Sequence, residues 1–303
     1  MTTPWRYDAA MRPFVAFTFA SLLLSCSSGE SIPTTCAGHE ELCEKRFDQV
    51  AFPATHNAMA DTDSNIFAAC QTHDVATQLE DGIRGFMLDL YTDPTEPGVV
   101  YTCHALCQRQ NHPLVAVLEA MVSHMKSHRD SILTIVLENY VSAADIDASV
   151  REARADRYLY AHTKGAPWPT LREMIDANTR LVILTDDEGG TETGAYPWLM
   201  DQWQYAFQNP YAAEQDSDFS CDVDRGTDAP NSLFVMNHFL TAPVASLSLA
   251  TMVNPYASLH PHVSRCVTER GRIPNLVTVD FYDVGDVIWV VDELNGFVSG
   301  PPP

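Results

Sequence analysis

Six polar side chains lie at or just beyond the ends of short apolar runs, and their types suit acid–base chemistry. They are His56, Asn57, Asp89, His104, Glu138 and Asp280. Two histidines suit a displacement in which one group takes a proton from an attacking hydroxyl and the other gives one to the leaving oxygen. The carboxylates and the amide are hard oxygen donors, which favour Ca²⁺ or Mg²⁺ over Zn²⁺. The set therefore indicates proton transfer beside a divalent cation, although each member alone is more often structural.

The runs that carry these residues alternate with amphipathic segments. Apolar residues at a helical spacing predict helices over Leu114–His128, Ala143–Ala155 and Leu171–Ile175. This alternation is typical of a parallel α/β sheet, and eight strands predict one (β/α)8 TIM barrel, whose active site lies at the carboxyl ends of the strands. The predicted strands are Gln49–Pro53, Gly85–Tyr91, Val99–Cys103, Ile132–Glu138, Leu181–Thr185, Gln202–Phe207, Leu233–Asn237 and Leu276–Phe281.

The N-terminal segment has the pattern of an export signal. Arg12 precedes an apolar run, Phe14–Leu24, that is too short to span a bilayer. The run leads into Leu23-Leu24-Ser25-Cys26, which resembles the bacterial lipobox, in which the cysteine is lipidated; an ordinary cleavable signal is the alternative. We expect a signal peptide at 1–25, a linker at 26–38 and a catalytic barrel at 39–299, in a protein that is a lipoprotein of the bacterial cell envelope or is secreted.

The charge of the chain restricts its partners. With 40 Asp and Glu against 18 Lys and Arg, the formal net charge is −22 and the sequence pI is about 4.6. Contacts to nucleic-acid phosphates come from Lys and Arg, so we expect no nucleic-acid partner. The same shortage of basic residues argues against a polybasic grip on an anionic membrane, and attachment would depend on lipidated Cys26 or on bridging by Ca²⁺. We expect the protein to act as a monomer.

Eight cysteines in an exported chain indicate disulfides rather than a zinc site. No Cys-x2-Cys pair is present, which disfavours zinc. If Cys26 is lipidated, seven cysteines remain and one is left over. The expected pairings are Cys36 with Cys43, Cys221 with Cys266, and Cys70 with either Cys103 or Cys107.

Several motifs resemble one known family. The segments 52–59 (FPATHNAM), 78–89 (QLEDGIRGFMLD) and 101–104 (YTCH), with Ile135–Asn139 and Val279–Tyr282 later, resemble the X domain of phosphatidylinositol-specific phospholipase C. This resemblance implies a (β/α)8 barrel in which His56 is the general base, His104 the general acid and Asp280 the carboxylate that orients the first histidine. Calcium-dependent members carry ligands at the positions of Asn57, Asp89 and Glu138, so the resemblance implies assistance by Ca²⁺.

The chain departs from that family at two places. Met87 occupies the position of a fourth, acidic calcium ligand, so we expect a weaker site. The lysines that follow the fifth strand in phosphoinositide-cleaving relatives are replaced by Asp186 and Asp187, which would repel extra phosphates on an inositol ring. Asp186 either accepts bonds from sugar hydroxyls or belongs to a solvated turn. Asn237, at the end of a strand, is a further candidate for substrate binding.

The sequence thus predicts a phosphoric diester hydrolase of the phospholipase C type, acting on a phospholipid such as phosphatidylinositol at a membrane surface. One alternative is a relative that binds phospholipid or sugar phosphate without turnover. The other is a glycerophosphodiester phosphodiesterase, but such enzymes pair a Glu with an Asp two residues later, where this chain has Met87-Leu88-Asp89.

Overall fold

The computed structural model of the chain describes Met1 and residues 32–64, 68–92, 96–104, 107, 112–187, 194–242 and 244–303. The predicted signal peptide and Cys26 fall outside these residues. The chain divides into two units, Met1–Ser31 and Ile32–Pro303. None of the described helices is both long and apolar enough to cross a membrane.

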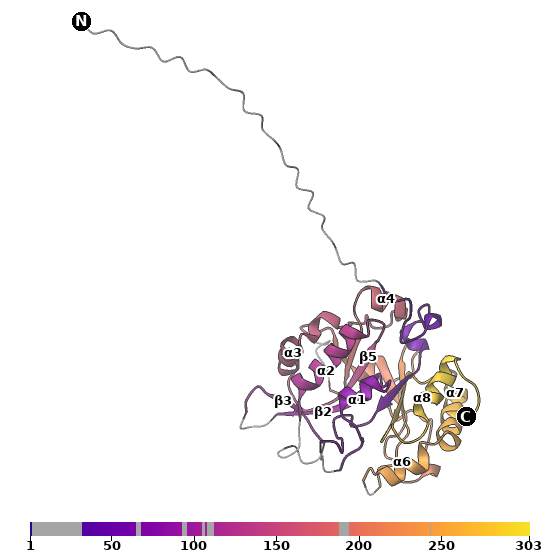
Figure 1. Cartoon of the computed structure of the whole chain (residues 1–303). Helices are drawn as coiled ribbons and strands as arrows, with labels where there is room; N and C mark the ends of the chain where they lie inside the picture. Colours follow the sequence, from indigo (N-terminus) through magenta and orange to yellow (C-terminus); the bar gives the residue numbers. More distant parts are fainter. Residues whose placement is uncertain are drawn as a thin grey trace. The chain divides into compact units, whose positions relative to one another are not determined.

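One sheet organises the second unit (Figure 1). Eight of its described strands run parallel, in the order β7-β6-β5-β2-β1-β11-β10-β8. Within the described ranges no ladder joins β7 to β8, so the sheet curls into the predicted α/β barrel with one seam left open. The strands are β1 Phe52–Thr55, β2 Gly85–Thr92, β3 Val100–Thr102, β4 His112–Pro113, β5 Leu133–Asn139, β6 Leu181–Thr185, β7 Leu199–Asp201, β8 Ala206–Gln208, β9 Arg225–Gly226, β10 Leu233–Asn237 and β11 Leu276–Val279.

One of the predicted barrel strands is wrong, and another is correct only at its end, where Ala206 and Phe207 belong to β8. The run predicted at Val99–Cys103 forms β3, which pairs antiparallel with β2 and with β4 and so leaves the barrel. The run predicted at Gln202–Phe207 contains a helical turn, α5, that separates β7 from β8. The Asp201 side chain accepts a hydrogen bond from the Trp203 backbone N–H, and this local cap starts the turn in spite of the aromatic residues that favour a strand.

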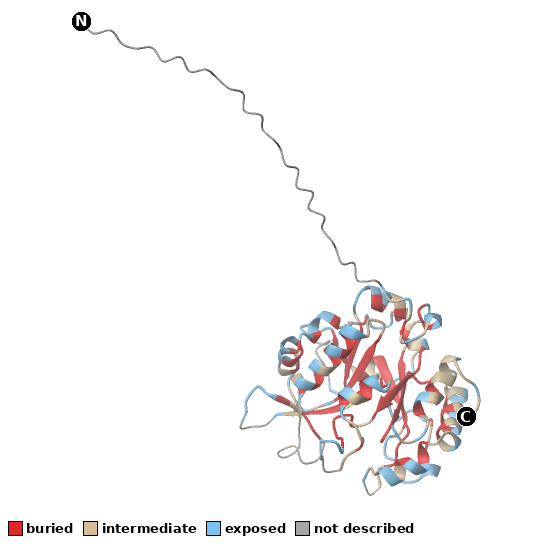
Figure 2. Ribbon diagram, viewed as in Figure 1, coloured by how far each residue is buried: buried red, intermediate tan, exposed pale blue. Residues whose placement is uncertain are grey.

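Helices cover the outside of the sheet, with their exposed faces turned away from the strands (Figures 1 and 2). In α2, the apolar positions that predicted the helix are buried against the sheet. Side-chain caps begin several helices; Thr170 and Glu173, for example, form a capping box at α4. The helices are α1 Val75–Glu80, α2 Leu114–Ser127, α3 Ala143–Glu152, α4 Leu171–Asp176, α5 Gln202–Tyr205, α6 Leu247–Val253, α7 Tyr256–Arg270 and α8 Val287–Asn295.

The parallel strands alternate between two apolar layers. In β5, Ile135 and Leu137 belong to the layer that also contains residues of α2, whereas Val136 belongs to a second layer inside the curl of the sheet. This follows from the two-residue period of a strand. The inner layer includes Phe52, Ala54, Val136, Val182, Leu184, Met200, Ala206, Leu233, Val235 and Leu276.

Three disulfides are present among the described residues. Two are the expected ones, Cys36–Cys43 and Cys221–Cys266. The third joins Cys103 to Cys107, so the expected bond from Cys70 to one of them is wrong, and Cys70 is a buried free thiol. The bond between Cys103 and Cys107, four residues apart, removes both possible partners of Cys70.

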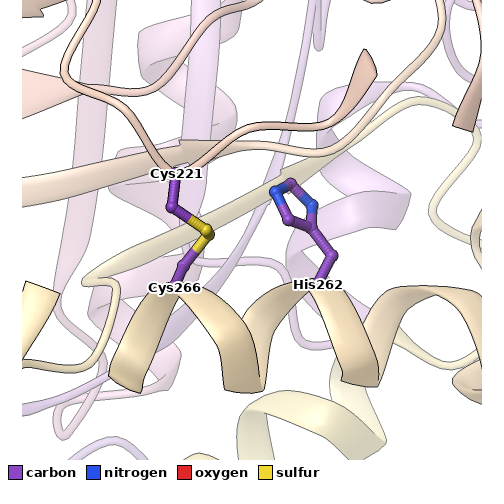
Figure 3. A group of neighbouring side chains, drawn as sticks. All are labelled: Cys221, His262 and Cys266. Carbon is purple, nitrogen blue, oxygen red and sulfur yellow. A yellow bond between two sulfur atoms is a disulfide. The ribbon is translucent and has the colours of Figure 1, made fainter. Parts of the chain in front are cut away.

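The long-range disulfide sits beside a buried histidine pair. His262 lies one turn before Cys266 on α7 (Figure 3). His262 is 4% exposed, and its Nδ1 lies 2.8 Å from Nδ1 of His238. Burial lowers the pKa of His238 to about 4 and that of His262 to about 3, so both rings are neutral at physiological pH.

Gly85 is required where β1, β2 and β11 meet. A Cβ at this position would lie 2.7 Å from Cβ of Ala54 and 2.8 Å from Cδ2 of Leu276. We expect Gly85→Ala to lower the free energy of unfolding by about 1–3 kcal/mol, because the inner layer has no room for the added methyl group. Urea denaturation measures the change.

The matched control is the double variant Gly85→Ala with Ala54→Gly. It removes the nearer clash, which involves a rigid Cβ, and leaves only the flexible Leu276 side chain to move. Partial recovery of stability is expected. Equal stability of Gly85→Ala and the wild type would contradict this account.

Candidate active site

The inward-facing positions become polar at one end of all eight parallel strands. In each strand the row of inward-facing side chains continues for one more position beyond the apolar layer. The residues at this position, one for each strand, are His56, Asp89, Glu138, Asp186, Gln202, Gln208, Asn237 and Asp280. All of them except Asp280 line one cavity of about 250 Å³. The same two-residue period that builds the apolar inner layer therefore builds the candidate site at the carboxyl ends of the strands.

His56 and Asp280 form a buried pair at the ends of neighbouring strands. Thr55 is in register with Val279 across β1 and β11, so the next residue of each strand meets its counterpart. Nδ1 of His56 donates to Oδ1 of Asp280 over 2.8 Å. Phe239 stacks on the imidazole with 4.0 Å between ring centroids and 3° between planes. The ring is thus fixed with its other nitrogen, Nε2, free of the Asp280 contact.

One buried amide holds the ends of these two strands together. Nε2 of Gln71 donates to the backbone carbonyls of His56 and Val279, over 2.8 and 3.1 Å. Its Oε1 accepts from the backbone N–H of Tyr282. Gln71 is completely buried, so these bonds fix the spacing between the strand ends. The motifs in the sequence gave no indication of this role.

The backbone after each of the two strands is strained. Asn57 has φ 45° and Phe281 has φ 44°, in the left-handed region that non-glycine residues rarely adopt. Hydrogen bonds hold both turns, including one from Phe281 N–H to the carbonyl oxygen of Cys70 over 2.7 Å. Such strain persists where the surroundings determine the backbone, and functional sites are common places for it.

The pair changes the protonation of His56. Burial acts to lower the pKa of His56, but the charge of Asp280 and its hydrogen bond outweigh burial and raise this pKa well above its ordinary value. Because the folded-state pKa of His56 exceeds its unfolded value, protonated His56 stabilises the fold below about pH 6.5, and this contribution is lost as the pH rises through the folded-state pKa. Burial raises the pKa of Asp280, and the contribution holds only while this carboxyl is ionised.

His104 reaches the same site from outside the barrel. It follows β3, and the Cys103–Cys107 disulfide closes the turn in which it lies. Its Nδ1 lies 3.3 Å from Oδ2 of Asp89 and 3.1 Å from Nδ2 of Asn57. The structure thus brings the two predicted histidines to one rim, although His104 arrives on an antiparallel strand rather than on a third barrel strand.

Three carboxylates line the cavity on the side of β2, β5 and β6. Asp89 and Glu138 are paired in register on adjacent strands. Asp186 follows β6 and accepts a hydrogen bond from Asn139 N–H over 2.8 Å. Tyr140 donates to Oε1 of Glu138 over 2.6 Å, and this bond raises the pKa of Tyr140. Burial, and then the charge of Glu138, raise the pKa of Asp186.

These residues suit a hard divalent cation. Asp89 is 6% exposed, and its Oδ2 faces His104, so Oδ1 is its remaining ligand atom. Asn57 uses its amide nitrogen toward His104 and toward Sγ of Cys70, which leaves Oδ1 as its ligand atom. Glu138 lines the cavity beside them. The repulsion among carboxylates that share one cavity is relieved by a bound cation, and oxygen donors of this kind fit Ca²⁺.

A cationic side chain that we did not predict lies on the other side of the cavity. Arg225, on β9, is the one Lys or Arg among the described lining residues. Its guanidinium carbon lies 5.6 Å from the ring centroid of Trp203 and 4.9 Å from that of Tyr211. Its NH2 group also donates to the Tyr211 hydroxyl over 3.0 Å. This arrangement holds a positive charge at the cavity without burying it.

Asn237 lines the cavity and is held by a neighbouring amide. Its Nδ2 donates to the carbonyl oxygen of Asn209 over 2.9 Å, and its backbone N–H donates to Oδ1 of the same residue. These bonds leave Oδ1 of Asn237 as the atom that can meet a substrate hydroxyl. Gln202 and Gln208 add further neutral polar groups to the lining.

The sequence matches the PI-PLC X domain over residues 42–295. The chain belongs to the PI-PLC X-domain family. PI-PLC X domain-containing protein 1 of Arthroderma benhamiae is 27% identical over 297 residues, which cover 91% of this chain and 95% of that protein. A second Arthroderma benhamiae relative, named as an uncharacterized secreted protein, is 27% identical over 289 residues, which cover 86% of this chain and 64% of that protein.

Solved structures of X-domain enzymes share the fold. A mutant of the phosphatidylinositol-specific phospholipase C from Staphylococcus aureus superimposes with a TM-score of 0.57 at 11% identity, covering 85% of this chain and 95% of that one. This likeness confirms the predicted barrel class of the X-domain chain.

In this X-domain site, the pKa of His56 depends on Asp280. We expect Asp280→Asn to lower the pKa of His56 below its ordinary value, because burial then acts without the opposing carboxylate. NMR titration of the histidine ring protons measures the change.

Asp63→Asn is the matched control. Asp63 pairs with the more exposed His73 over 2.9 Å, and this pair raises the pKa of His73. The control should lower the pKa of His73 and leave that of His56 in place. A His56 pKa that is the same in Asp280→Asn and the wild type would show that Asp280 does not control this imidazole.

Proposed function

We propose that this X-domain protein is a phosphoric diester hydrolase of the phospholipase C type, which cleaves the bond between glycerol and phosphate in phosphatidylinositol or a related phospholipid. The observation that carries the proposal is the pair of histidines, each beside a buried carboxylate, at one rim of the cavity. A single histidine would support many roles. Two imidazoles held at one site support the transfer of two protons in one displacement.

His56 acts as the general base. Asp280 accepts the proton on Nδ1, which leaves the lone pair of neutral His56 on Nε2. Nε2 takes the proton of the inositol 2-hydroxyl, and the hydroxyl oxygen attacks phosphorus to form a cyclic phosphate. Because Asp280 also raises the pKa of His56, this step requires a pH at which the imidazole has lost its second proton.

His104 acts as the general acid. When His104 is protonated, its Nδ1–H donates to Oδ2 of Asp89 and no longer accepts from the Asn57 amide, so the proton on Nε2 is the one delivered to the glycerol oxygen as the phosphorus–oxygen bond breaks. The products of this first step are diacylglycerol and the cyclic phosphate. Water then opens the cyclic phosphate with the roles of the histidines reversed.

Asn57, Asp89 and Glu138 would hold Ca²⁺ in this enzyme. A bound Ca²⁺ would supply charge stabilisation at the phosphoryl oxygens and lower the pKa of the attacking hydroxyl. Met87 faces the cavity at the position where the family pattern has a fourth acidic ligand, so the site offers fewer protein oxygens.

The lining of the cavity supports a polyol headgroup with a single phosphate. Arg225 supplies one positive charge for the phosphodiester, and Asp186 and Asn237 supply acceptors for hydroxyl groups. Asp186 and Glu138 would repel further phosphates on the ring. Polyphosphorylated phosphoinositides are therefore poor substrates in this proposal.

The proposal places the enzyme outside the cytoplasm. The three disulfides support export, as does the similarity to a relative named as secreted. A lipid on Cys26 would hold the monomeric enzyme at the membrane that contains its substrate, which its acidic surface does not attract.

The activity is tested by headgroup release from vesicles of single phospholipids in the presence of Ca²⁺. We expect release from phosphatidylinositol, and a fall of about 10²–10⁴-fold in His56→Ala and in His104→Ala, which is the usual contribution of a general acid or base. His73→Ala, which alters a histidine that does not line the cavity, should retain the wild-type rate.

Each other outcome selects an alternative. Binding to vesicles without release of any headgroup would identify a lipid-binding relative that lacks turnover. Release from glycerophosphodiesters, but not from diacyl lipids, would identify a glycerophosphodiester phosphodiesterase. Full activity of His56→Ala would contradict the mechanism.

The calcium site is tested by calorimetry and by the dependence of the rate on Ca²⁺. We expect Asp89→Ala to abolish binding, because it removes the buried carboxylate of the site, and Met87→Glu to lower the Ca²⁺ concentration needed for half-maximal rate, because it adds a carboxylate to the cavity. Asp176→Asn, at an exposed position of α4, is the control for general charge effects. Equal calcium affinity in Asp89→Ala and the wild type would exclude this site.

A further inference from the structure

Three groups of described side chains bring three possible metal-ligand atoms within 4.8 Å of one another. The first is Cys221, His262 and Cys266, whose two sulfur atoms are already joined in a disulfide (Figure 3). The second is Glu80, His124 and His128. The third is His56, Cys70 and Asp280.

The third group differs from the others because its sulfur is a free thiol next to the proposed base. Cys70 is 1% exposed and forms no disulfide, and Asp280 is 3% exposed. The side chain of His56 is 22% exposed and lines the cavity, whereas Cys70 and Asp280 do not line it. The thiol and the carboxylate therefore lie behind the imidazole as seen from the cavity.

The atoms of this group face one another. Nδ1 of His56 lies 2.8 Å from Oδ1 of Asp280. Sγ of Cys70 lies 3.7 Å from Nδ2 of Asn57, on the turn that follows His56. The Cys70 thiol and the Asp280 carboxylate both interact with the imidazole of His56. A thiol, an imidazole nitrogen and a carboxylate oxygen thus converge on one small volume.

We propose that His56, Cys70 and Asp280 form an inhibitory site for a thiophilic divalent cation such as Zn²⁺, distinct from the calcium site. The binding stands on the geometry alone, and its effect on catalysis rests on the function proposed above. Sulfur, nitrogen and oxygen donors in one group are the ligand set of four-coordinate Zn²⁺, whereas Ca²⁺ takes oxygen ligands. Ca²⁺ would thus bind on the Oδ1 side of Asn57, and Zn²⁺ on the Nδ2 side, where Cys70 lies.

The group of ligands with its bound cation carries no net charge. The Cys70 thiol loses its proton to solvent, and Nδ1 of His56 gives up its proton and binds the cation. Cys70 thiolate and Asp280 carboxylate then carry two negative charges against the two positive charges of the ion. A net neutral group avoids the cost of a buried unpaired charge.

The bound ion removes the general base. An imidazole whose Nδ1 is bound to a metal holds its single proton on Nε2. Nε2 is the nitrogen that must accept the proton of the attacking hydroxyl, so His56 cannot start the reaction. Asp280, as a metal ligand, can no longer orient the ring by accepting the proton of Nδ1.

Binding is tested first without any measurement of activity. Cd²⁺ is added to the full chain in a Cys26→Ser background with the three disulfides intact, so that Cys70 is the remaining thiol. We expect an ultraviolet thiolate-to-cadmium charge-transfer band with one ion per chain, and a change in the NMR signals of His56 at Nδ1. The band should be absent in Cys70→Ala and in Cys70→Ser.

His128→Ala is the matched control, because it removes a ligand from the Glu80, His124 and His128 group and leaves Cys70 unchanged. It should keep the full band. Absence of the band in the parent protein, or its persistence in Cys70→Ala, would overturn the proposed site. Because this experiment records only spectra, it tests whether the metal binds at this site even if the protein proves to have no hydrolase activity.

The second arm measures headgroup release at saturating Ca²⁺ while Zn²⁺ is increased, with each variant compared with its own zinc-free rate. We expect the parent to be inhibited and Cys70→Ala to need at least about a hundredfold more Zn²⁺, because loss of even an indirect partner of a metal costs about 10–100-fold in affinity. Equal inhibition of both proteins would show that Zn²⁺ acts elsewhere, for example by replacing Ca²⁺ at Asp89, and would overturn the inhibitory role.

Discussion

The two-residue period of a parallel strand is the constraint on which this molecule depends. It sends alternate side chains into the curl of the sheet, where they pack as an apolar layer and close the lower part of the barrel. One step beyond that layer the same positions are polar, and all eight strands deliver such a residue to one end. In each strand, the apolar residue that packs in the inner layer and the polar residue that lines the site are thus successive inward-facing positions. A shift of one residue in the register of β1 would put Asn57 in the place of His56 and separate the imidazole from Asp280.

The polar end of the barrel is stabilised by groups that do not react. The turns after β1 and β11 adopt unfavourable backbone angles, and neutral amides hold them: Gln71 binds the strand ends, and Asn254 donates to the carbonyl oxygens of Asp280 and Phe281. A buried amide that donates to the backbone adds rigidity without adding charge. The ionisable groups are thus positioned by amides, which do not gain or lose a proton themselves.

Much of this arrangement could be predicted from the sequence, because apolar runs mark strands and the polar residues that end them mark the rim. Contacts that depend on distant segments were beyond such reasoning. His104 was assigned to a barrel strand because a short β-branched run does not reveal the direction in which it pairs. The disulfide of Cys103 could not be assigned from spacing alone, and Arg225 lies in a stretch that carries no motif. The stacking of Phe239 on His56 likewise joins two strands that are far apart in the chain.

The single amide of Gln71 has a consequence for how the site tolerates its surroundings. A carboxamide neither gains nor loses a proton in the range where proteins remain folded, and it carries no net charge for salt to screen. The distance between the carbonyl groups that follow β1 and β11 is therefore insensitive to acidity and ionic strength. The exported protein that we propose would meet fluids whose composition it does not control. The ionisable side chains of the cavity respond to such changes, while the amide that spaces the two strand ends does not.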